Sequence, residues 1–521
     1  MKKKITLHVD PSRTKIRPWD STLKEVLSEV LSYETPKKGR VFARQMAKAK
    51  GFAPPPDRQS LVHGTGSFKT GLLSQAVEVL NTDPRLANYE YEIDNLVPHP
   101  PLDVDAAAKR LEAIPFVPRD YQYDAIFTAI EQGRGVIAIP TGGGKSVVLA
   151  GVAAALNLKT LIVVDSEDLA KQLKREIEEA TGVSTGRLWT GTPAKETECQ
   201  FVVCLRQTLV NRIAGDNAPM SKWAKTIGCI IVDECHHATS DGYDKIFSSL
   251  PNATYRFGFT ATPEGSSYDG DEDLASNTIL IKANIGPVIY ELKMKHLIEQ
   301  GWLSRPVIKL IQNEIIVTDF TTDYGLETEL HLVNGEARNR MGCQIALEAY
   351  HKGENVIIFV KRVAHGLIVR DMLIDMGVHK DQVAYINGTT EGSKRSEAIE
   401  NFKQGTTKIL IGTVLTEGLN FVVSTGVNLG GGRSGRYIVQ ALGRVLRKPK
   451  SEGQDVVKSD VRHVAFYDML DSGHVGRAPK GVVHHPMFRK HGRLRRERYE
   501  QEGHQIIMLQ PSVASNGDYS I

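Results

Sequence analysis

Residues 135–146 read GVIAIPTGGGKS, and this stretch decides the fold. The β-branched run Gly135–Ile139 leads into three glycines, and a helical pattern opens at Lys145 and Ser146. In such a loop the backbone N–H groups close around phosphate oxygens at a helix N-terminus, the lysine reaches the β and γ phosphates, and the serine hydroxyl binds Mg²⁺. Ile139 stands where the full G-x-x-x-x-G-K-[ST] pattern has its first glycine. The order of strand, loop, Lys-Ser and helix still predicts a phosphate site rather than a plain glycine-rich turn.

A pair of carboxylates follows another predicted strand, Cys229–Val232. At the end of such a strand one carboxylate, here Asp233, can hold Mg²⁺, and the other, Glu234, can orient and deprotonate an attacking water. The neighbouring Cys235–His237 leaves a metal cluster as the alternative, although three consecutive residues cannot easily wrap one ion.

The rhythm of the chain around these motifs predicts an α/β fold, because short β-branched runs alternate with helical patterns. Strands are expected at 135–139, 160–164, 200–205, 229–232 and 255–259, and again at 355–360, 383–386, 408–411 and 463–467. Before the proline cluster Pro98–Pro101, residues 5–95 read as a small α+β unit, with a strand at Ile5–Val9 and a helix at Thr22–Tyr33. The predicted units are residues 1–98, 102–305 and 306–475 with a basic tail at 476–521, and the two α/β domains join around Ser304–Ile316.

Charge is distributed unevenly along the 521 residues, whose net charge is only +4. Residues 1–100 carry 16 Lys and Arg against 11 Asp and Glu, and residues 472–503 carry 8 against 3, so each end has a net +5 and the remainder −6. Basic ends around an acidic body suggest surfaces for nucleic-acid phosphates, with chance clustering of surface charge as the alternative. The five cysteines show no paired spacing and no apolar run approaches a membrane span or signal peptide, so a cytoplasmic protein is expected, in the host cytoplasm if phage-encoded.

Further motifs, taken in order, resemble those of helicase superfamily 2. The matching segments are Arg119–Gln122 (Q motif), Gly142–Ser146 (motif I), Asp233–His236 (motif II), Gly258–Pro263 (motif III), Gly412–Asn420 (motif V) and Gln440–Arg447 (motif VI). The resemblance implies two tandem RecA-like P-loop domains with parallel sheets, an ATP hydrolase that uses ATP and Mg²⁺, and hydrolysis that depends on closure of the cleft between the domains.

The resemblance also implies roles for individual residues. The implied catalytic set is Lys145, Glu234, Gln440, Arg444 and Arg447, and the two arginines, one helical turn apart, act as arginine fingers. The metal is held by Ser146 and Asp233. The two domains are coupled through Thr260 and Thr262. ATP is bound by Arg119, Tyr121, Gln122, Thr141, Gly142, Gly143, Gly144, Lys145, Ser146 and Gly418. A dinucleotide fingerprint at Gly430–Gly435 fits G-x-G-x-x-G literally, but it directly precedes motif VI and needs no second cofactor.

Expected nucleic-acid contacts lie on the motor track and at the basic ends. They are Gln207, Thr208, Lys361, His365 and Thr413, with Lys37, Lys38 and Arg40 near the N-terminus and Arg489, Lys490, Arg493, Arg495 and Arg496 in the tail. Asp165-Ser166 replaces the usual Pro-Thr of motif Ia and Asn420 a common aspartate of motif V, so contacts at these segments are less defined.

Within the superfamily the chain most resembles the UvsW-type branched-DNA helicases of bacteriophages, and more distantly the XPB and RecG group. The segments Gly286–Tyr290, Leu297–Leu303, Val360–Gly366 and Phe488–Tyr499 carry this likeness. It implies a DNA helicase that remodels Holliday junctions, forks, D-loops or R-loops. The implied partners are branched or forked DNA and RNA–DNA hybrids, and a monomer is compatible with the resemblance. The alternatives are an RNA-dependent ATPase, an annealing protein with an ATPase switch, and the motor subunit of a nuclease complex.

Overall fold

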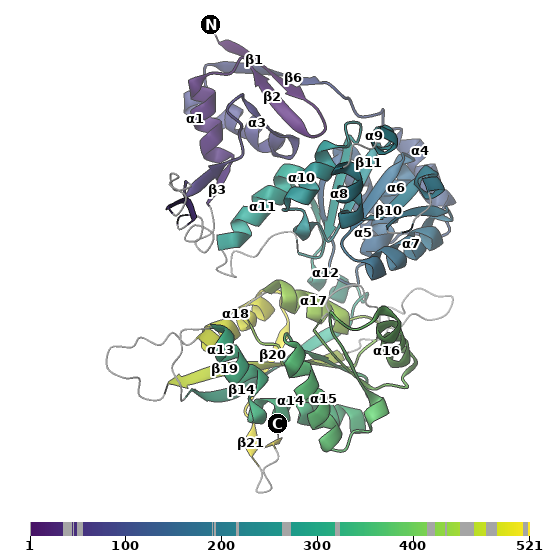
Figure 1. The fold of residues 1–521 in the computed structure, drawn as a ribbon, viewed down its shortest axis with the longest axis vertical. Helices are drawn as coiled ribbons and strands as arrows, with labels where there is room; N and C mark the ends of the chain where they lie inside the picture. The colour runs from purple at the N-terminus through teal and green to yellow at the C-terminus, as the bar shows by residue number, and fades with distance from the viewer. Residues whose placement is uncertain are drawn as a thin grey trace. The chain divides into compact units, whose positions relative to one another are not determined.

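A computed structural model of the chain describes residues 2–34, 44, 46–48, 56–189, 191, 194–214, 218–262, 272–317, 324–413, 422–432, 435–448, 463–475, 487–513 and 519–520. The chain divides into two compact units, residues 1–139 with 144–292 and residues 140–143 with 293–521 (Figure 1). Among the described residues, every helix is too short or too polar to span a bilayer.

The N-terminal domain is a small sheet with two helices against one face. Its strands run in the order β5 (Ser67–Lys69), β2 (Arg13–Arg17), β1 (Lys3–Val9), β6 (Tyr89–Asn95), and its helices are α1 (Ser21–Val30) and α3 (Leu73–Thr82). Asp20 caps α1 by accepting a hydrogen bond from the Leu23 N–H. The predicted helix over Thr22–Tyr33 ends early, at Val30, because Ser32–Glu34 pairs as β3 with β4 (Arg58–Ser60).

Two arginines, the buried Arg256 and the half-buried Arg134, attach this domain to the first α/β domain. Arg256 is 1% exposed and donates hydrogen bonds to three backbone carbonyls of its own domain and to the Oγ of Ser12. Arg134, its neighbour across the sheet, reaches the carbonyl of Pro11 at 3.3 Å. Since a buried guanidinium is costly to leave unpaired, these contacts resist separation of the two domains. The N-terminal domain and the first α/β domain therefore form one unit.

The first α/β domain contains a sheet of seven parallel strands. In spatial order they are β13 (Val288–Glu291), β7 (Arg134–Ala138), β12 (Tyr255–Thr260), β11 (Cys229–Asp233), β8 (Thr160–Val164), β10 (Phe201–Leu205) and β9 (Thr185–Leu188). The helices are α4 (Val104–Ala113), α5 (Asp120–Gln132), α6 (Lys145–Leu156), α7 (Glu167–Thr181), α8 (Arg206–Ala214), α9 (Ala218–Ala224), α10 (Asp241–Ser248) and α11 (Glu272–Asn284). The five predicted strands are confirmed to within one residue, and β9 and β13 were not predicted.

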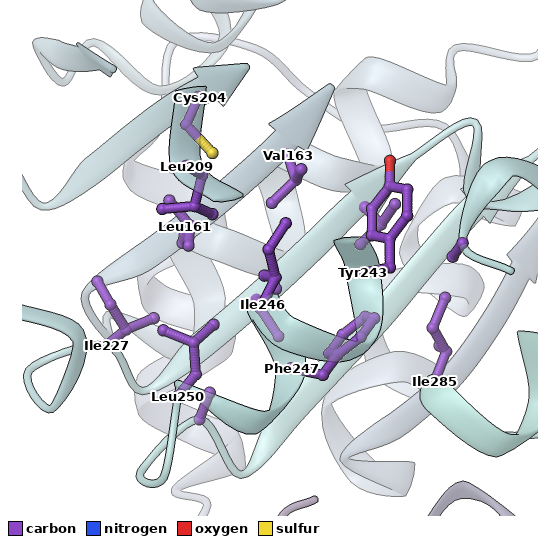
Figure 2. Close-up of a cluster of buried hydrophobic side chains, with 14 of the residues drawn as sticks. Leu161, Val163, Cys204, Leu209, Ile227, Tyr243, Ile246, Phe247, Leu250 and Ile285 are labelled. Atoms are coloured by element: carbon purple, nitrogen blue, oxygen red, sulfur yellow. The ribbon is translucent and has the colours of Figure 1, made fainter. Parts of the chain in front are cut away.

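A continuous apolar cluster holds one face of this sheet against α8, α9 and α10. Leu161 and Val163, two positions apart on β8, point to the same face and meet Leu209 of α8 and Ile246 of α10 (Figure 2). Burial of these side chains fixes the strands, and with them the ends of the strands that carry the candidate site.

The second α/β domain repeats the architecture with another sheet of seven parallel strands. In spatial order they are β16 (Val383–Ile386), β17 (Ile409–Gly412), β15 (Val356–Phe359), β18 (Thr425–Asn428), β19 (His463–Val475), β14 (Arg305–Val317) and β20 (Gln505–Leu509). The helices are α12 (Met294–Glu299), α13 (Tyr324–Thr328), α14 (Glu336–His351), α15 (Val363–Asp375), α16 (Gly392–Gln404), α17 (Gly435–Val445) and α18 (Met487–Gln501). The fold predicted from the sequence, two α/β domains with parallel sheets and an α+β N-terminal part, is confirmed.

The segment around which the two α/β domains were expected to join, Ser304–Ile316, is mostly strand β14, which lies inside the second sheet between β19 and β20. The expected start of the second domain at residue 306 therefore falls at the start of β14. The expectation of a separate basic tail is wrong, since β20 extends this sheet and α18 packs on β19. Phe488 and Tyr499 of α18 are buried. The sequence of β14 is rich in Val and Ile, which favour strands, but only sheet pairing shows where the strand belongs.

Candidate functional site

The phosphate loop joins the end of β7 to the start of α6. Gly142 and Gly144 adopt φ angles of +89° and +77°, in the left-handed region that only glycine enters without strain. The Gly143 N–H closes the turn on the Pro140 carbonyl at 2.9 Å. Helix α6 then begins at Lys145, so its free N–H groups and Ser146 stand at the loop, the arrangement that binds phosphate.

The predicted Q motif lies beside this loop. The Gln122 side chain accepts a hydrogen bond from the Arg119 N–H at 2.9 Å, and a Cβ atom at Gly144 would come within 2.3 Å of its Nε2. Arg119 also donates to the hydroxyl of Tyr121 at 2.9 Å, and the Tyr290 hydroxyl binds the Tyr121 carbonyl. The structure thus brings the Q-motif residues to the phosphate loop, and Gly144 admits them by lacking a side chain.

Three charged side chains meet at the edge of the sheet. The Lys145 Nζ lies 2.8 Å from the Asp233 Oδ1 and also forms an ion pair with Glu234. All three are largely buried. Burial alone lowers the pKa of the Lys145 ammonium, but the two carboxylates outweigh it and raise that pKa. Burial raises the pKa of the Glu234 carboxyl, and the charges of Lys145 and His236 outweigh it and lower that pKa, so the carboxylate stays ionised.

His236 links the Glu234 carboxylate to the neighbouring strand β12, a role that was not predicted from the sequence. Its Nδ1 lies 3.3 Å from the Glu234 Oε2 and 3.5 Å from the Thr260 Oγ1, and the same hydroxyl accepts a hydrogen bond from the Thr262 N–H. Glu234 itself has a φ of +47°, a strained value for a non-glycine residue. The D-E-x-H spacing was the available signal, since it puts a histidine two residues after the second carboxylate.

The donor set fits ATP and Mg²⁺. The Ser146 hydroxyl and the Asp233 carboxylate are hard oxygen donors, which Mg²⁺ prefers. Lys145 now neutralises both carboxylates, and it has the length to turn to a bound phosphate instead. Magnesium would supply charge neutralisation for the phosphates, while Glu234 would orient water. The predicted metal residue Asp233 and the predicted base Glu234 therefore lie together, with Lys145 contacting both, and Ser146 follows Lys145 at the start of α6.

The motif VI residues belong to the second unit. Gln440 and Arg444 lie on α17, and each is 6% exposed. Arg447 does not lie on this helix as predicted, because α17 ends at Val445 and Arg447 pairs through its backbone with Leu303. The predicted ATP contact Gly418 lies outside the described residues.

Most described nucleic-acid candidates are accessible, but two are not. Gln207 and Lys361 are exposed, Thr208 and Thr413 are half-buried, and in the tail Arg489, Lys490, Arg493 and Arg496 are exposed. His365 is 2% exposed and bonded to the Asn339 side chain at 2.8 Å, and Arg495 is 2% exposed in an ion pair with Asp468. The expectation that these two contact nucleic acid is wrong, because both side chains are enclosed by protein. Lys37, Lys38 and Arg40 lie outside the described residues.

Two family profiles match the chain in order. The family described as "Type III restriction enzyme, res subunit" matches residues 115–265, and "Helicase conserved C-terminal domain" matches residues 338–449. The two matches fall on the two α/β domains.

Known proteins resemble the chain across both domains. The ATP-dependent DNA helicase uvsW of Enterobacteria phage T4 is 26% identical over 431 residues, covering 78% of this chain and 79% of the relative. The DNA 3'-5' translocase XPB2 of Sulfurisphaera tokodaii is 27% identical, covering 64% of this chain and 79% of the relative. A fragment of a type I restriction enzyme HsdR subunit from Vibrio vulnificus shares the fold, with a TM-score of 0.55 at 17% identity over 81% of this chain and 73% of the fragment.

Proposed function

The chain belongs to helicase superfamily 2 and is an ATP-dependent helicase that hydrolyses ATP, and from this premise we propose that it remodels branched DNA. In this proposal ATP with Mg²⁺ binds at the phosphate loop, and Glu234 acts as general base. The motif VI residues of the second domain, Gln440, Arg444 and Arg447, take part in the hydrolysis step, as the resemblance to superfamily 2 implies. Forks, four-way junctions, D-loops and R-loops are the substrates.

The observation that carries the hydrolysis step is the cluster of Lys145, Asp233 and Glu234. An ionised carboxylate next to a metal-binding carboxylate and a phosphate-binding lysine is the set that phosphoryl transfer to water requires. The Lys145 contacts to both carboxylates support this assignment. Support for DNA as the partner comes from the likeness to the phage T4 DNA helicase over 78% of the chain.

Basic surfaces beyond the motor track support a substrate with several duplex arms. On α18 the exposed face carries Arg489 and Lys490, which can meet phosphates. In the N-terminal sheet, Arg13 and Lys15 lie on the β2 side. Acidic residues occupy the opposite edge, on β6, so the β2 side is the one that fits a phosphate backbone.

A panel of nucleic acids tests the proposal. ATP hydrolysis and strand displacement are measured on single strands, blunt duplex, forks, four-way junctions and RNA–DNA hybrids. Forks and junctions are expected to stimulate hydrolysis and to be unwound more than blunt duplex. Stronger stimulation by RNA would identify an RNA-dependent ATPase instead, and pairing activity that survives Lys145→Ala would identify an annealing protein.

The motor subunit of a restriction or nuclease complex is a second candidate, favoured by the family profile that matches residues 115–265. That match spans only the first α/β domain, which motors of many kinds share. Cleavage of the DNA panel by the purified chain, or only after addition of a nuclease partner, would support this candidate over remodelling.

A further inference from the structure

A short glycine loop, Leu429–Gly432, leads from β18 toward α17, and the dinucleotide fingerprint falls on it. Gly431 and Gly432 have φ angles of +58° and +84°, so the chain turns here in a conformation that other residues avoid. Helix α17, which carries Gln440 and Arg444, begins three residues after the glycine loop, so a displacement of the loop acts close to the start of that helix.

Buried charge holds the beginning of the glycine loop. The guanidinium of Arg338 on α14 binds both carboxylate oxygens of Asp471, at 2.8 and 3.1 Å, and its Nη1 donates to the Leu429 carbonyl at 2.8 Å. Asn313 of β14 donates to the same carboxylate at 3.0 Å. Both carboxylate oxygens of Asp471 therefore accept hydrogen bonds from buried donors.

A second buried pair, Arg495 with Asp468, holds the end of the loop. The Nη1 of Arg495 donates to the Gly432 carbonyl at 2.6 Å and its Nη2 to the Met469 carbonyl at 2.5 Å, while its Nε binds the Asp468 Oδ2 at 2.8 Å. The hydroxyl of Tyr499 donates to the same oxygen at 2.9 Å. Arg495 and Tyr499 lie one turn apart on α18, so this helix is joined directly to the loop.

Stability alone does not account for such pairs. A buried ion pair contributes little more to folding than apolar residues of the same volume, because both charges lose their hydration. An apolar side chain, however, cannot donate to a backbone carbonyl. What Arg495 provides, and a leucine would not, is a directed attachment of α18 to the glycine loop.

The two faces of α18 have different contacts: one face is bonded to the interior of the domain, and the other is open to a nucleic acid. Its buried face carries Arg495, and its exposed face carries Arg489, Lys490, Arg493 and Arg496. Arg493 and Arg496 form ion pairs with Glu497 and Glu500 of the same helix. Within the described part of the chain Arg489 and Lys490 form no ion pair, so these two offer the least compensated charge to a phosphate.

We propose that α18 couples nucleic-acid binding to the ATPase: nucleic acid bound on its exposed face shifts the helix, and Arg495 passes the shift through the glycine loop to α17. The inference rests on the proposed function, and Arg495 is a positioning residue in it. The shift is transmitted rather than absorbed because a buried guanidinium bound at three atoms cannot release a partner without a large desolvation cost.

Arg495→Lys tests this step. Lysine keeps the buried positive charge near Asp468 but lacks the planar fork that reaches two carbonyls at once. With a saturating forked DNA, kcat for ATP is expected to fall roughly 10- to 100-fold, the scale of a misplaced catalytic group, while KM for ATP and Kd for DNA change less than twofold. Tyr499→Phe is the matched control, because it removes another hydrogen bond to the same carboxylate without touching the loop, and it should keep kcat.

The outcomes separate this inference from the proposed function. A wild-type chain that no DNA stimulates would overturn both. Normal stimulation in the wild type together with unchanged kcat in Arg495→Lys, or an equal loss in Tyr499→Phe, would overturn the coupling alone.

Hydrogen exchange of the folded full chain gives a second test, which stands even if Arg495→Lys fails to fold. Saturating forked DNA is expected to slow amide exchange in α17 of the wild type but not of Arg489→Gln/Lys490→Gln, although the variant is saturated with DNA. Equal slowing in both chains would overturn the coupling, since the exposed face of α18 would then have no part in it.

Discussion

The two α/β domains share one architecture but use buried charge in opposite ways. At the edge of the first sheet, Lys145 bridges Asp233 and Glu234, and the backbone of Glu234 is strained. In the second domain, Asp468 is 0% exposed and accepts hydrogen bonds from Asn428, Arg495 and Tyr499, with no comparable strain. A cluster in which one cation serves two anions is ready to rearrange when phosphate arrives, whereas a fully paired network resists rearrangement.

The same chemical change should therefore have different consequences in the two domains. Glu234→Gln removes the proposed base but keeps its shape, so ATP turnover should fall by about 10²- to 10⁴-fold while ATP binding persists. Phosphate release and nucleotide binding measure the two effects. Near-normal turnover would end the assignment of Glu234 as the base.

Asp468→Asn is the counterpart in the second domain. It leaves Arg495 charged and without its carboxylate, and loss of one partner of a buried pair costs about 3–5 kcal/mol of unfolding free energy. Denaturant unfolding measures this loss. Asp371→Asn is the matched control, because Asp371 is exposed and should leave stability unchanged. Equal unfolding free energies for Asp468→Asn and Asp371→Asn would show that the hydrogen bonds of Asp468 do not stabilise the domain.

Acid should weaken the second domain through His365. Burial, and then the nearby Arg338, lower the pKa of this imidazole to about 3. Below the unfolded pKa of about 6.5 the unfolded chain takes up a proton that the folded chain does not, so His365 lowers stability by about 2 kcal/mol between pH 7 and pH 5. Unfolding curves at both pH values should show this loss, and His365→Gln should reduce it. If the unfolding free energy of His365→Gln depended on pH as strongly as that of the wild type, the lowered pKa of His365 would be contradicted.

The smallest expected effect concerns the exposed face of α18. Arg489→Gln/Lys490→Gln should weaken DNA binding and reduce the slope of log affinity against log salt by about 2. The matched pair Arg493→Gln/Arg496→Gln should change the slope less, because Glu497 and Glu500 already compensate these arginines. Titrations at several salt concentrations measure both slopes, and equal changes would indicate that the helix binds as a uniform patch.

Local patterns were enough to predict the strands that carry the candidate site. The run Thr160–Val164 is a strand with the predicted bounds, and the loop before Lys145 has its glycines where the backbone turns left-handed. Both features depend only on residues close in the sequence. The strand follows from its run of apolar residues, and the turn follows from the backbone conformations that only glycine adopts easily. The order of motifs then placed the chain in its superfamily.

Burial and long-range pairing could not be predicted in this way. Arg495 stands in a run of basic residues that all suit a nucleic-acid surface, yet helical periodicity turns it inward onto Asp468, far away in the sequence. His365 lies in an expected contact motif and is enclosed instead. The sequence by itself determined the ATPase motifs and the two parallel sheets, because these follow from local chemistry. Only the tertiary structure decided which charges are buried, since burial depends on what packs against each residue from elsewhere in the chain.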